Sequence, residues 1–271
     1  MVHIISVINH KGGVGKTTST ANIGAGLNHL KKKVLIVDID PQANLTRHFG
    51  VSKTLDQSIY GALTGEYPLP VTNIKPGFDL SPSHEDLIAW EKLVADEPGR
   101  ELFLRDVLEP VKDNYDYILI DCPPSLNLLP VNALCASHSI LITVEPSLFS
   151  IEGMSNILNA VSKVRTRINK ELNGCRILIT RYFSAKTFHK NAEKVIRKNY
   201  EGLVFDTKIR TNVALEEAVM KGIDIFEYAA GSNGAKDYKT VCNEIIKLKQ
   251  WSRREKKILR RGWICSFKKQ R

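Results

Sequence analysis

Two kinds of hydrophobic pattern alternate along the chain. Short runs that are apolar at nearly every position are typical of strands buried on both faces of a parallel sheet. The strands predicted in this way are Ile4–Ile8, Val34–Val37, Tyr117–Ile120, Ser139–Val144 and Arg176–Thr180. Helical patterns such as Thr17–Leu30 and Glu152–Ile168 lie between them. This alternation predicts an α/β fold, a doubly wound and mostly parallel sheet with helices on both faces.

The pattern changes in two places. Residues 50–115 are the least regular part of the chain and are rich in Gly and Pro, and we expect small helices there, over the edge of the sheet. From residue 247 onward the composition becomes strongly basic. We therefore divide the chain into an α/β domain, residues 1–246, and a C-terminal tail, residues 247–271.

Charge distinguishes the tail from the rest of the chain. The 271 residues carry a net charge of +10, from 39 Lys and Arg and 29 Asp and Glu. Eleven of the basic residues and one of the acidic residues lie in residues 247–271, so the domain before them has no net charge. Any affinity for anionic partners that depends on net charge is therefore expected from the tail.

Cysteine spacing and hydropathy exclude several classes of protein. The five cysteines form no Cys-x-x-Cys pair and are spaced neither as a zinc site nor as a disulfide framework. The N-terminus has no signal-peptide pattern, and no run of about 18 apolar residues is present to span a membrane. We expect a reduced, cytoplasmic protein.

A glycine-rich segment joins the first predicted strand to the first predicted helix. It reads Lys11-Gly12-Gly13-Val14-Gly15-Lys16-Thr17-Thr18, and His10 stands where the usual Gly-x-x-x-x-Gly-Lys-Ser/Thr pattern begins with glycine. Glycines let backbone N–H groups turn toward phosphate oxygens, and the helix points its positive end to the same place. Lys16 then reaches the phosphates and Thr17 holds Mg²⁺. The order of strand, loop and helix disfavours a turn without a ligand.

Acidic residues follow two further predicted strands. Asp38 and Asp40 come after Val34–Val37, and Asp121 comes after Tyr117–Ile120. Carboxylates at the C-terminal ends of parallel strands face the crevice where such sheets bind ligands. There they hold Mg²⁺ or orient an attacking water. An Asp after a strand is on its own more often a turn former or a helix cap, so this interpretation depends on the glycine-rich loop.

Three separated motifs resemble the deviant Walker ATPases, and specifically the ParA/Soj family of partition ATPases in the MinD/ParA superfamily. They are KGGVGKTT, then DxDPQxNxT from Asp38 to Thr46, then ILIDCPPS from Ile118 to Ser125. Parts of residues 209–238 resemble the C-terminal region of this family, so the resemblance covers about residues 1–246. It implies a P-loop ATPase domain that uses ATP and Mg²⁺.

The resemblance also implies roles for individual residues. Lys11 reaches across a dimer to the partner's ATP, Lys16 serves the nucleotide of its own subunit, and Asp40 positions the hydrolytic water. Asp38 and Asp121 organise Mg²⁺, mainly through water, together with Thr17. The nucleotide-binding residues are Lys11, Gly12, Gly13, Val14, Gly15, Lys16, Thr17, Thr18 and Asn212.

The surroundings of the adenine depart from the family pattern. Thr180, Arg181 and residues 209–212 are expected near the base. The family's usual Ile-Pro-Arg-Asn is here Ile209-Arg210-Thr211-Asn212, so the proline is replaced and the arginine is shifted by one position.

By resemblance, the protein is an ATP-dependent switch for plasmid or chromosome partition. ATP favours a sandwich homodimer, the dimer binds DNA without sequence preference, and a ParB-like partner stimulates slow hydrolysis that resets it. A nucleoid-associated location follows. Candidate DNA contacts are Lys186, Lys190, Lys194, Arg197, Lys198, Arg210 and Lys221. The four between residues 190 and 198 repeat at helical spacing, as a merely solvated helix face would also do.

The tail has three interpretations. Its apolar residues fall on one broad side of a helix with Lys and Arg around them: Trp251, Ile258, Leu259, Trp263 and Phe267. It is a basic arm on DNA, an amphipathic helix on an anionic membrane as in the sibling MinD branch, or a solvated, disordered segment. Gly262 weakens a helix here by about 1 kcal/mol relative to Ala.

Two alternatives to the partition function remain open. A MinD-like membrane-cycling positioning ATPase would use the tail to bind anionic lipid. A metabolic or electron-transfer relative would need other chemistry, and the reductase version lacks paired cysteines for an iron–sulfur cluster, since Cys122 and Cys135 are the only nearby candidates. Because the glycine-rich loop starts at residue 11, we expect no N-terminal helix-turn-helix and no operator binding.

Overall fold

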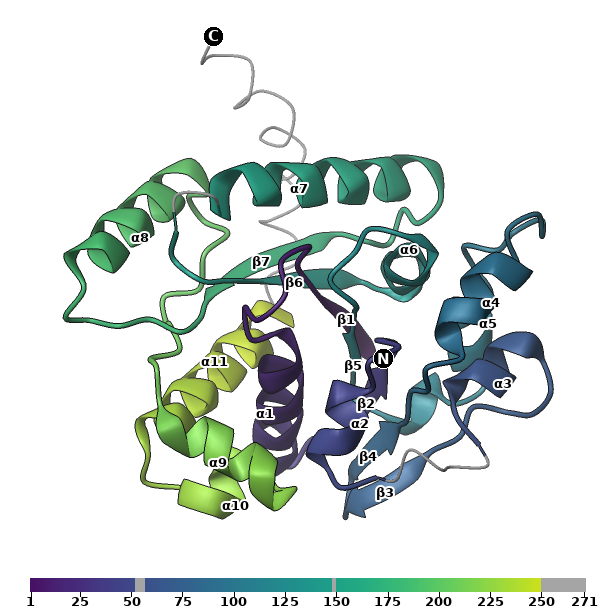
Figure 1. Cartoon of the computed structure of the whole chain (residues 1–271), viewed down its shortest axis with the longest axis horizontal. Coiled ribbons are helices and arrows are strands. Elements are labelled where there is room, and N and C mark those ends of the chain that lie inside the picture. The colour runs from purple at the N-terminus through teal and green to yellow at the C-terminus, as the bar shows by residue number, and fades with distance from the viewer. Residues whose placement is uncertain (52–56, 148–149, 250–271) are drawn as a thin grey trace, which may run out of the picture.

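A single seven-stranded sheet forms the centre of the computed structural model, which describes residues 1–51, 57–147 and 150–249 (Figure 1). The strands are β1 His3–Ile8, β2 Val34–Asp38, β3 Thr72–Lys75, β4 Phe78–Ser81, β5 Tyr117–Asp121, β6 Ser139–Val144 and β7 Gly174–Ile179. Their order is β3-β4-β2-β5-β1-β6-β7, and only the β3–β4 pair is antiparallel. The α/β fold class predicted from the sequence is confirmed.

Helices cover both faces of the sheet (Figure 1). They are α1 Lys16–His29, α2 Asn44–His48, α3 Ile59–Thr64, α4 Leu87–Leu93, α5 Phe103–Leu108, α6 Leu128–Ala136, α7 Ser150–Arg167, α8 Thr187–Asn199, α9 Val213–Lys221, α10 Ile225–Ala229 and α11 Asn233–Lys249, with a 3₁₀ turn η1 at Lys112–Asn114. Helices α1, α9, α10 and α11 pack on one face, and α3 to α7 pack on the other. None of the helices in the described part of the chain is both long and apolar enough to cross a membrane.

Two hydrophobic clusters follow from the pleat of the central strands. Ile4 and Ile118 lie side by side in register and belong to the cluster under α6 and α7. Their neighbours in sequence, Ile5 and Leu119, belong to the cluster under α1 and α11. Successive side chains of a strand point to opposite faces, so a strand that is apolar at every position serves both clusters. This is why continuous apolar runs identified the central strands.

The edge of the sheet was predicted incompletely. Residues 50–115 hold the small helices α3, α4 and α5, as expected, but they also hold β3 and β4, which were missed. Both strands have four residues and meet at the turn Pro76-Gly77, where Gly77 has φ +75°. β3 is an edge strand with polar, half-buried residues, so it lacks the continuous apolar run that marks a central strand.

The boundary between domain and tail falls within a helix. α11 continues to Lys249, three residues beyond the composition change that we placed after residue 246. The predicted apolar stripe of the tail, from Trp251 to Phe267, lies outside the described residues.

Candidate functional site

The glycine-rich segment forms an open loop between β1 and α1. Gly13 and Gly15 have φ of +74° and +79°, a left-handed conformation that side chains other than glycine rarely adopt. Gly15 is the N-cap of α1, so the first N–H groups of this helix face the loop. A Cβ at Gly12 would meet nothing within 4 Å, which leaves the backbone open to a ligand. The loop therefore has the features of a phosphate cradle.

Residues at the ends of neighbouring strands hold this loop in place through hydrogen bonds. Asn9 donates to the carbonyl of Thr143 at 2.5 Å and accepts from the N–H of Lys11 at 3.0 Å. The Thr180 hydroxyl donates to the carbonyl of Val14 at 2.8 Å, and Arg181 donates to that of Gly13 at 3.2 Å. The Val14 side chain is buried. Apart from the N–H of Lys11, these bonds use carbonyl oxygens, so they do not occupy the N–H groups of residues 12–18 that a phosphate needs.

His10, which replaces the usual first glycine, packs against α7. A Cβ built on Gly153 of α7 would lie 1.8 Å from Cε1 of the His10 imidazole. A side chain at residue 153 would therefore require the His10 imidazole to move. The glycine that the sequence pattern lacks at residue 10 is matched by a glycine on the opposing helix.

Lys16 lies in the wall of the site. Its side chain donates from Nζ to the carbonyl oxygen of Lys11 at 3.2 Å, and the residue is only 7% exposed. Burial lowers the pKa of Lys16, while Asp121 acts in the opposite direction. Lys11 itself is exposed. The two lysines of the motif thus have different environments: Lys16 is buried in the wall of the site, and Lys11 is exposed next to Gly12, which lines it.

Asp38 and Asp121 face each other at the ends of two paired strands. They are partners in the β2–β5 register and both are buried. Asp38 accepts from the N–H and the hydroxyl of Thr46 at 2.9 and 2.8 Å, and from the N–H of Asp40 at 3.1 Å. Burial raises the pKa of Asp38 to about 7 despite these bonds. Such a pair of buried carboxyls is unfavourable unless a cation lies nearby.

Asp121 provides the direct test of fit for a divalent cation. Its Oδ1 accepts from the Thr20 hydroxyl at 3.3 Å, whereas its buried Oδ2 has no hydrogen-bond partner among the described residues. Burial and then the charge of Asp38 raise the pKa of Asp121 well above its ordinary value, and the hydroxyl of Thr17 opposes the rise. A buried carboxylate oxygen beside a threonine hydroxyl is a suitable donor set for Mg²⁺.

Asp40 is held in place by the backbone around it. Its Oδ1 accepts from the N–H of Gln42 at 2.9 Å, and its carbonyl oxygen accepts from the Ser83 hydroxyl at 2.7 Å. The residue is buried, yet it lines the cavity beside the loop. Thr46 connects Asp38 to this segment. Its hydroxyl donates to Asp38 and also accepts from the N–H of Ser83 at 2.9 Å.

A cavity of about 600 Å³ is lined by the loop and by Asp40, whereas the buried Asp38 and Asp121 are not among its lining residues. One wall is the phosphate loop with Thr17, Thr18 and Asp40, and the other is formed by Thr180, Arg181, residues 209–212, Leu215 and Glu216. This volume is in the range of cofactor sites, about 300–1,000 Å³. The cavity therefore has a polar end for phosphates and a second wall for the remainder of a nucleotide.

The second wall is fixed by α9 and α11. Asn212 is the N-cap of α9 and accepts from the N–H of Ala214 at 2.9 Å. Arg210 makes a two-point ion pair with Asp237 of α11, with Nε–Oδ2 and Nη2–Oδ1 distances of 3.0 and 2.6 Å. Arg210 was a candidate DNA contact; the structure places it in the cavity wall, where its side chain pairs with a carboxylate and is 42% exposed.

The other candidate DNA contacts lie mainly on one helix. Lys190, Lys194 and Lys198 are exposed on α8, and Lys186 is exposed at its start. Arg197 of the same helix bonds to Glu193 at 3.0 Å and to the carbonyl oxygen of Phe205 at 3.1 Å. Lys221 is exposed at the end of α9. The structure thus places Lys186, Lys190, Lys194 and Lys198 together at α8. The side chains of Arg197 and Arg210 bond to other residues of the domain.

Some residues that shape the site were given no role from the sequence. Thr46 was part of the DxDPQxNxT motif, but no role was assigned to it. Ser83 follows β4, a strand that was not predicted, so its contact with Asp40 had no sequence signal. Tyr238, whose hydroxyl lies 3.1 Å from that of Ser19, joins α11 to α1 below the loop.

Comparison with known sequences identifies the family. The family model of the AAA domain matches residues 2–174. Sporulation initiation inhibitor protein Soj of Bacillus subtilis is 38% identical over 250 residues, which cover 90% of this chain and 98% of that protein. Chromosome partitioning protein ParA of Caulobacter vibrioides is 32% identical over 251 residues, covering 90% and 94%. The chain belongs to the ParA/Soj family of P-loop ATPases.

Solved structures agree with this assignment. Cobyrinic acid a,c-diamide synthase from Mycobacterium smegmatis, with bound ADP and magnesium, is similar with a TM-score of 0.81 and 29% identity, covering 93% of this chain and 96% of that one. The septum site-determining protein MinD from Pyrococcus horikoshii, complexed with Mg-ADP, has a TM-score of 0.75 and 25% identity, covering 93% and 99%. The protein is an ATPase, and its cofactors are ATP and Mg²⁺.

Proposed function

We propose that this ATPase is the switch of a plasmid or chromosome partition system. The observation that carries the proposal is the exposure of Lys11 next to Gly12, which lines the nucleotide cavity. Lys16 Nζ bonds to the Lys11 carbonyl from inside the wall, while the Lys11 side chain is exposed. One lysine is thus suited to its own subunit's nucleotide and the other to a nucleotide held by a facing subunit, which supports an ATP-bound homodimer.

Within each subunit, we assign the phosphates to the loop and the metal to the buried acids. Lys16 and the N–H groups of residues 12–18 bind phosphate oxygens, and Asn212 lies in the wall assigned to the base. Thr17, Asp38 and Asp121 hold Mg²⁺, with Asp38 acting through water. The ion neutralises charge on the phosphates. The unpartnered Oδ2 of Asp121 supports this donor set.

Asp40 is assigned to the water that attacks the terminal phosphate. Its carboxylate lines the cavity, and the bond from the Gln42 N–H fixes its orientation. Lys11 of the facing subunit adds positive charge where negative charge develops during transfer. Hydrolysis then depends on the dimer, so ATP bound to a monomer is not hydrolysed.

The exposed lysines of α8 are assigned to DNA. In a dimer, two copies of Lys186, Lys190, Lys194 and Lys198 face the same polyanion, and each phosphate contact adds to a salt-sensitive affinity without base specificity. A ParB-like partner stimulates hydrolysis and returns the protein to the monomer. The ATP-bound protein is then associated with the nucleoid. Residues 1–246 perform this cycle, and the tail adds charge.

The proposal is tested by titrating the chain onto random-sequence duplex DNA with ATP or with ADP. We expect ATP to raise the affinity by tenfold or more, about 1.4 kcal/mol, because the dimer doubles the number of phosphate contacts. Asp40→Ala should keep this ATP-dependent binding and lose turnover by about 10²-fold, the usual contribution of a positioned acid or base. DNA affinity is measured by fluorescence anisotropy and turnover by phosphate release.

A chain ending at residue 249 is the control for the tail. If it keeps the difference between ATP and ADP, the switch resides in the domain. Equal DNA affinity with both nucleotides in the full chain would contradict the proposal. ATP-dependent binding to anionic liposomes that is lost with the tail would favour the MinD-like membrane-cycling function, which the basic, aromatic composition of residues 251–267 makes the second candidate.

A further inference from the structure

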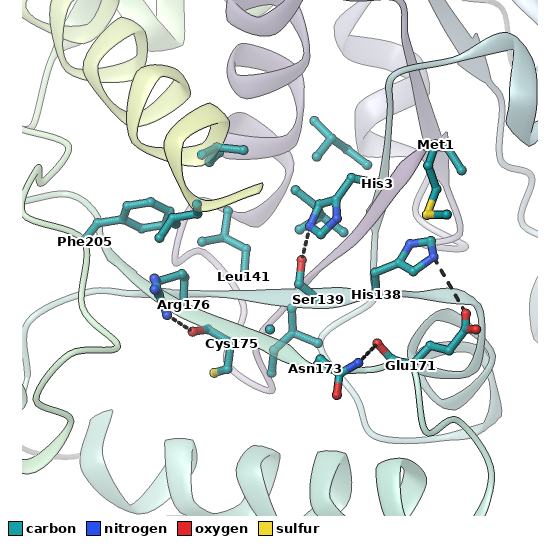
Figure 2. A pocket seen from close by; sticks show the side chains of 17 residues that line it. Met1, His3, His138, Ser139, Leu141, Glu171, Asn173, Cys175, Arg176 and Phe205 are labelled. Atoms are coloured by element: carbon teal, nitrogen blue, oxygen red, sulfur yellow. Dashed lines mark hydrogen bonds and ion pairs between the residues drawn. The ribbon is translucent and has the colours of Figure 1, made fainter. Parts of the chain in front are cut away.

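A second cavity lies at the opposite end of the strands from the phosphate loop (Figure 2). Its volume is about 510 Å³, within the range of about 300–1,000 Å³ that is usual for small-molecule sites. It is bounded by the first residues of three parallel strands, His3 of β1, Ser139 of β6 and Gly174 of β7. None of the described residues that line it also lines the nucleotide cavity, so ATP does not account for it.

Small residues in the sheet leave room for this cavity. Leu119, Ile5, Ser139 and Gly174 lie side by side in register across β5, β1, β6 and β7. Leucine and isoleucine give half of this row bulk, whereas serine and glycine give the other half almost none. A Cβ at Gly174 would lie 2.5 Å from the Cβ of Ser139, so a side chain there would collide with the serine. The space above these two residues therefore stays open between the sheet and the helix that faces it.

Most of the wall is apolar. Leu141 lines the cavity two residues after Ser139 on β6, and Phe205 lines it from the segment that follows α8. Ile245 and Leu248 line it from the last turns of α11. Apolar side chains that border an unfilled space lack contact partners on that side. A guest with an apolar body would supply these contacts and would itself be removed from water.

One guanidinium lies within this apolar wall. Arg176 is the only Arg or Lys among the described residues that line the cavity, and it is the register partner of Leu141 (Figure 2). Its Nη1 donates to the carbonyl of Cys175 at 2.8 Å. Burial lowers the pKa of Arg176, because an apolar environment disfavours the charged form. An anion beside the guanidinium would offset this cost, so the wall is suited to a guest with a negative end.

The other polar side chains of the wall bond to the protein itself. His3 Nε2 lies 2.9 Å from the Ser139 hydroxyl, and His138 Nδ1 accepts from the N–H of Ile4 at 3.0 Å (Figure 2). The carboxylate among the lining residues is that of Glu171, whose side chain is 81% exposed and lies 3.9 Å from His138. A carboxylate directed to solvent does not neutralise a guanidinium inside the wall.

We propose that this second cavity binds a small amphipathic carboxylate, of the size of a medium-chain fatty acid, with its carboxylate on Arg176 and its apolar chain against Ile5, Leu119 and Phe205. A guanidinium matches the geometry of a carboxylate and bonds to it at two points. A wholly apolar guest would leave the guanidinium facing hydrocarbon, and a ligand rich in phosphate would leave the apolar wall without contacts. A chain with one anionic end satisfies both parts of the wall.

The test titrates the full chain with hexanoate, octanoate and decanoate by isothermal titration calorimetry. We expect one site per chain. Affinity should rise about fourfold for each added methylene, the equivalent of about 0.8 kcal/mol for moving it from water into an apolar site. Saturating ADP and Mg²⁺ should leave the affinity unchanged, because the two cavities share no described lining residue.

Arg176→Met separates the two parts of the site, because methionine keeps an apolar stem and removes the charge. Octanoate should bind this variant about tenfold more weakly or worse, the usual loss of a hydrogen bond to a charged group. Octanol has the same chain without the carboxylate and should bind the variant and the unaltered protein alike. Arg105→Met, which changes an exposed arginine on α5, is the matched control and should bind octanoate normally. Circular dichroism checks that both variants are folded.

Each outcome decides for or against the proposal. No measurable binding of decanoate, or an affinity that does not rise with chain length, would overturn it. Several equivalent sites per chain would indicate adsorption to the surface, and loss of binding in saturating ADP would place the carboxylate in the nucleotide cavity; both overturn it. Equal octanoate affinity in Arg176→Met and Arg105→Met does so as well. If Arg176→Met does not fold, the chain-length series and the ADP competition in the unaltered protein still decide.

Discussion

The central strands carry a cavity at each end, and the two cavities are similar in size but are lined by different groups. At the C-terminal ends of the strands, a cavity of about 600 Å³ is lined by a glycine loop, Lys16 and Asp40. At the N-terminal ends, a cavity of about 510 Å³ is lined mainly by side chains of the hydrophobic core. The difference follows from the direction of the chain. β1 feeds into the N-terminus of α1, which favours anions, whereas α11 ends beside the first residues of the strands.

The largest effect is expected at the nucleotide cavity, at the C-terminal ends of the strands. Lys16→Ala removes the only described lysine within the cavity wall and should lower ATP turnover by at least about 10²-fold, the cost of losing one preorganised donor to a developing charge. Phosphate release at saturating ATP measures it. Lys33→Ala, an exposed lysine just before β2 at the opposite edge, is the matched control and should behave as the unaltered protein. Equal loss in both variants would contradict the assignment.

The next largest effect concerns the second cavity, at the N-terminal ends of the strands. Phe205→Ala should lower the free energy of unfolding by about 3 kcal/mol, because it truncates a buried aromatic ring. ATP turnover of the folded protein should change little, since Phe205 lines only the second cavity. Urea unfolding measures the first quantity and phosphate release the second. Phe188→Ala, with a ring that is 47% exposed on α8, should change stability by only a few tenths of a kcal/mol. A large loss of turnover in Phe205→Ala would show that the second cavity affects the nucleotide cavity.

The smallest effect concerns Arg210 and decides whether this residue serves the nucleotide cavity or DNA. Arg210 is either a wall residue, held by Asp237, or a DNA contact. As a wall residue, Arg210→Ala and Asp237→Ala should each raise the KM for ATP by about threefold, in line with a partly exposed, two-point ion pair worth under 1 kcal/mol. DNA affinity of the ATP-bound protein, measured at saturating nucleotide, should stay unchanged. Weaker DNA binding in Arg210→Ala alone would assign the arginine to DNA.

The centre of the fold was predictable because its signals are local. Strands buried on both faces must be apolar throughout, and the phosphate loop needs glycines between a strand and a helix. Asp38, Asp40 and Asp121 could be placed together because the C-terminal ends of parallel strands meet at one edge. The predicted ends of these strands differ from the observed ones by at most two residues.

The remainder depends on contacts between segments far apart in the sequence. β3 and β4 have only four residues each, and pairing rather than a long apolar run makes them strands: β4 pairs with β2, and the half-buried β3 pairs with β4. Ser83 reaches Asp40 only because β4 lies beside β2. The pairing of Arg210 with Asp237 depends on α11 lying against residues 209–212. None of these contacts has a spacing or a composition that a single sequence reveals.

The contact between His10 and Gly153 has an evolutionary consequence. Because the imidazole fills the space that a side chain at residue 153 would need, the residues permitted at these two positions depend on each other. A relative with glycine at the position of His10 has room for alanine or serine on the facing helix, whereas a relative with histidine would have to turn the imidazole aside. Among homologous sequences, the two positions should therefore covary, with histidine at the first found together with glycine at the second.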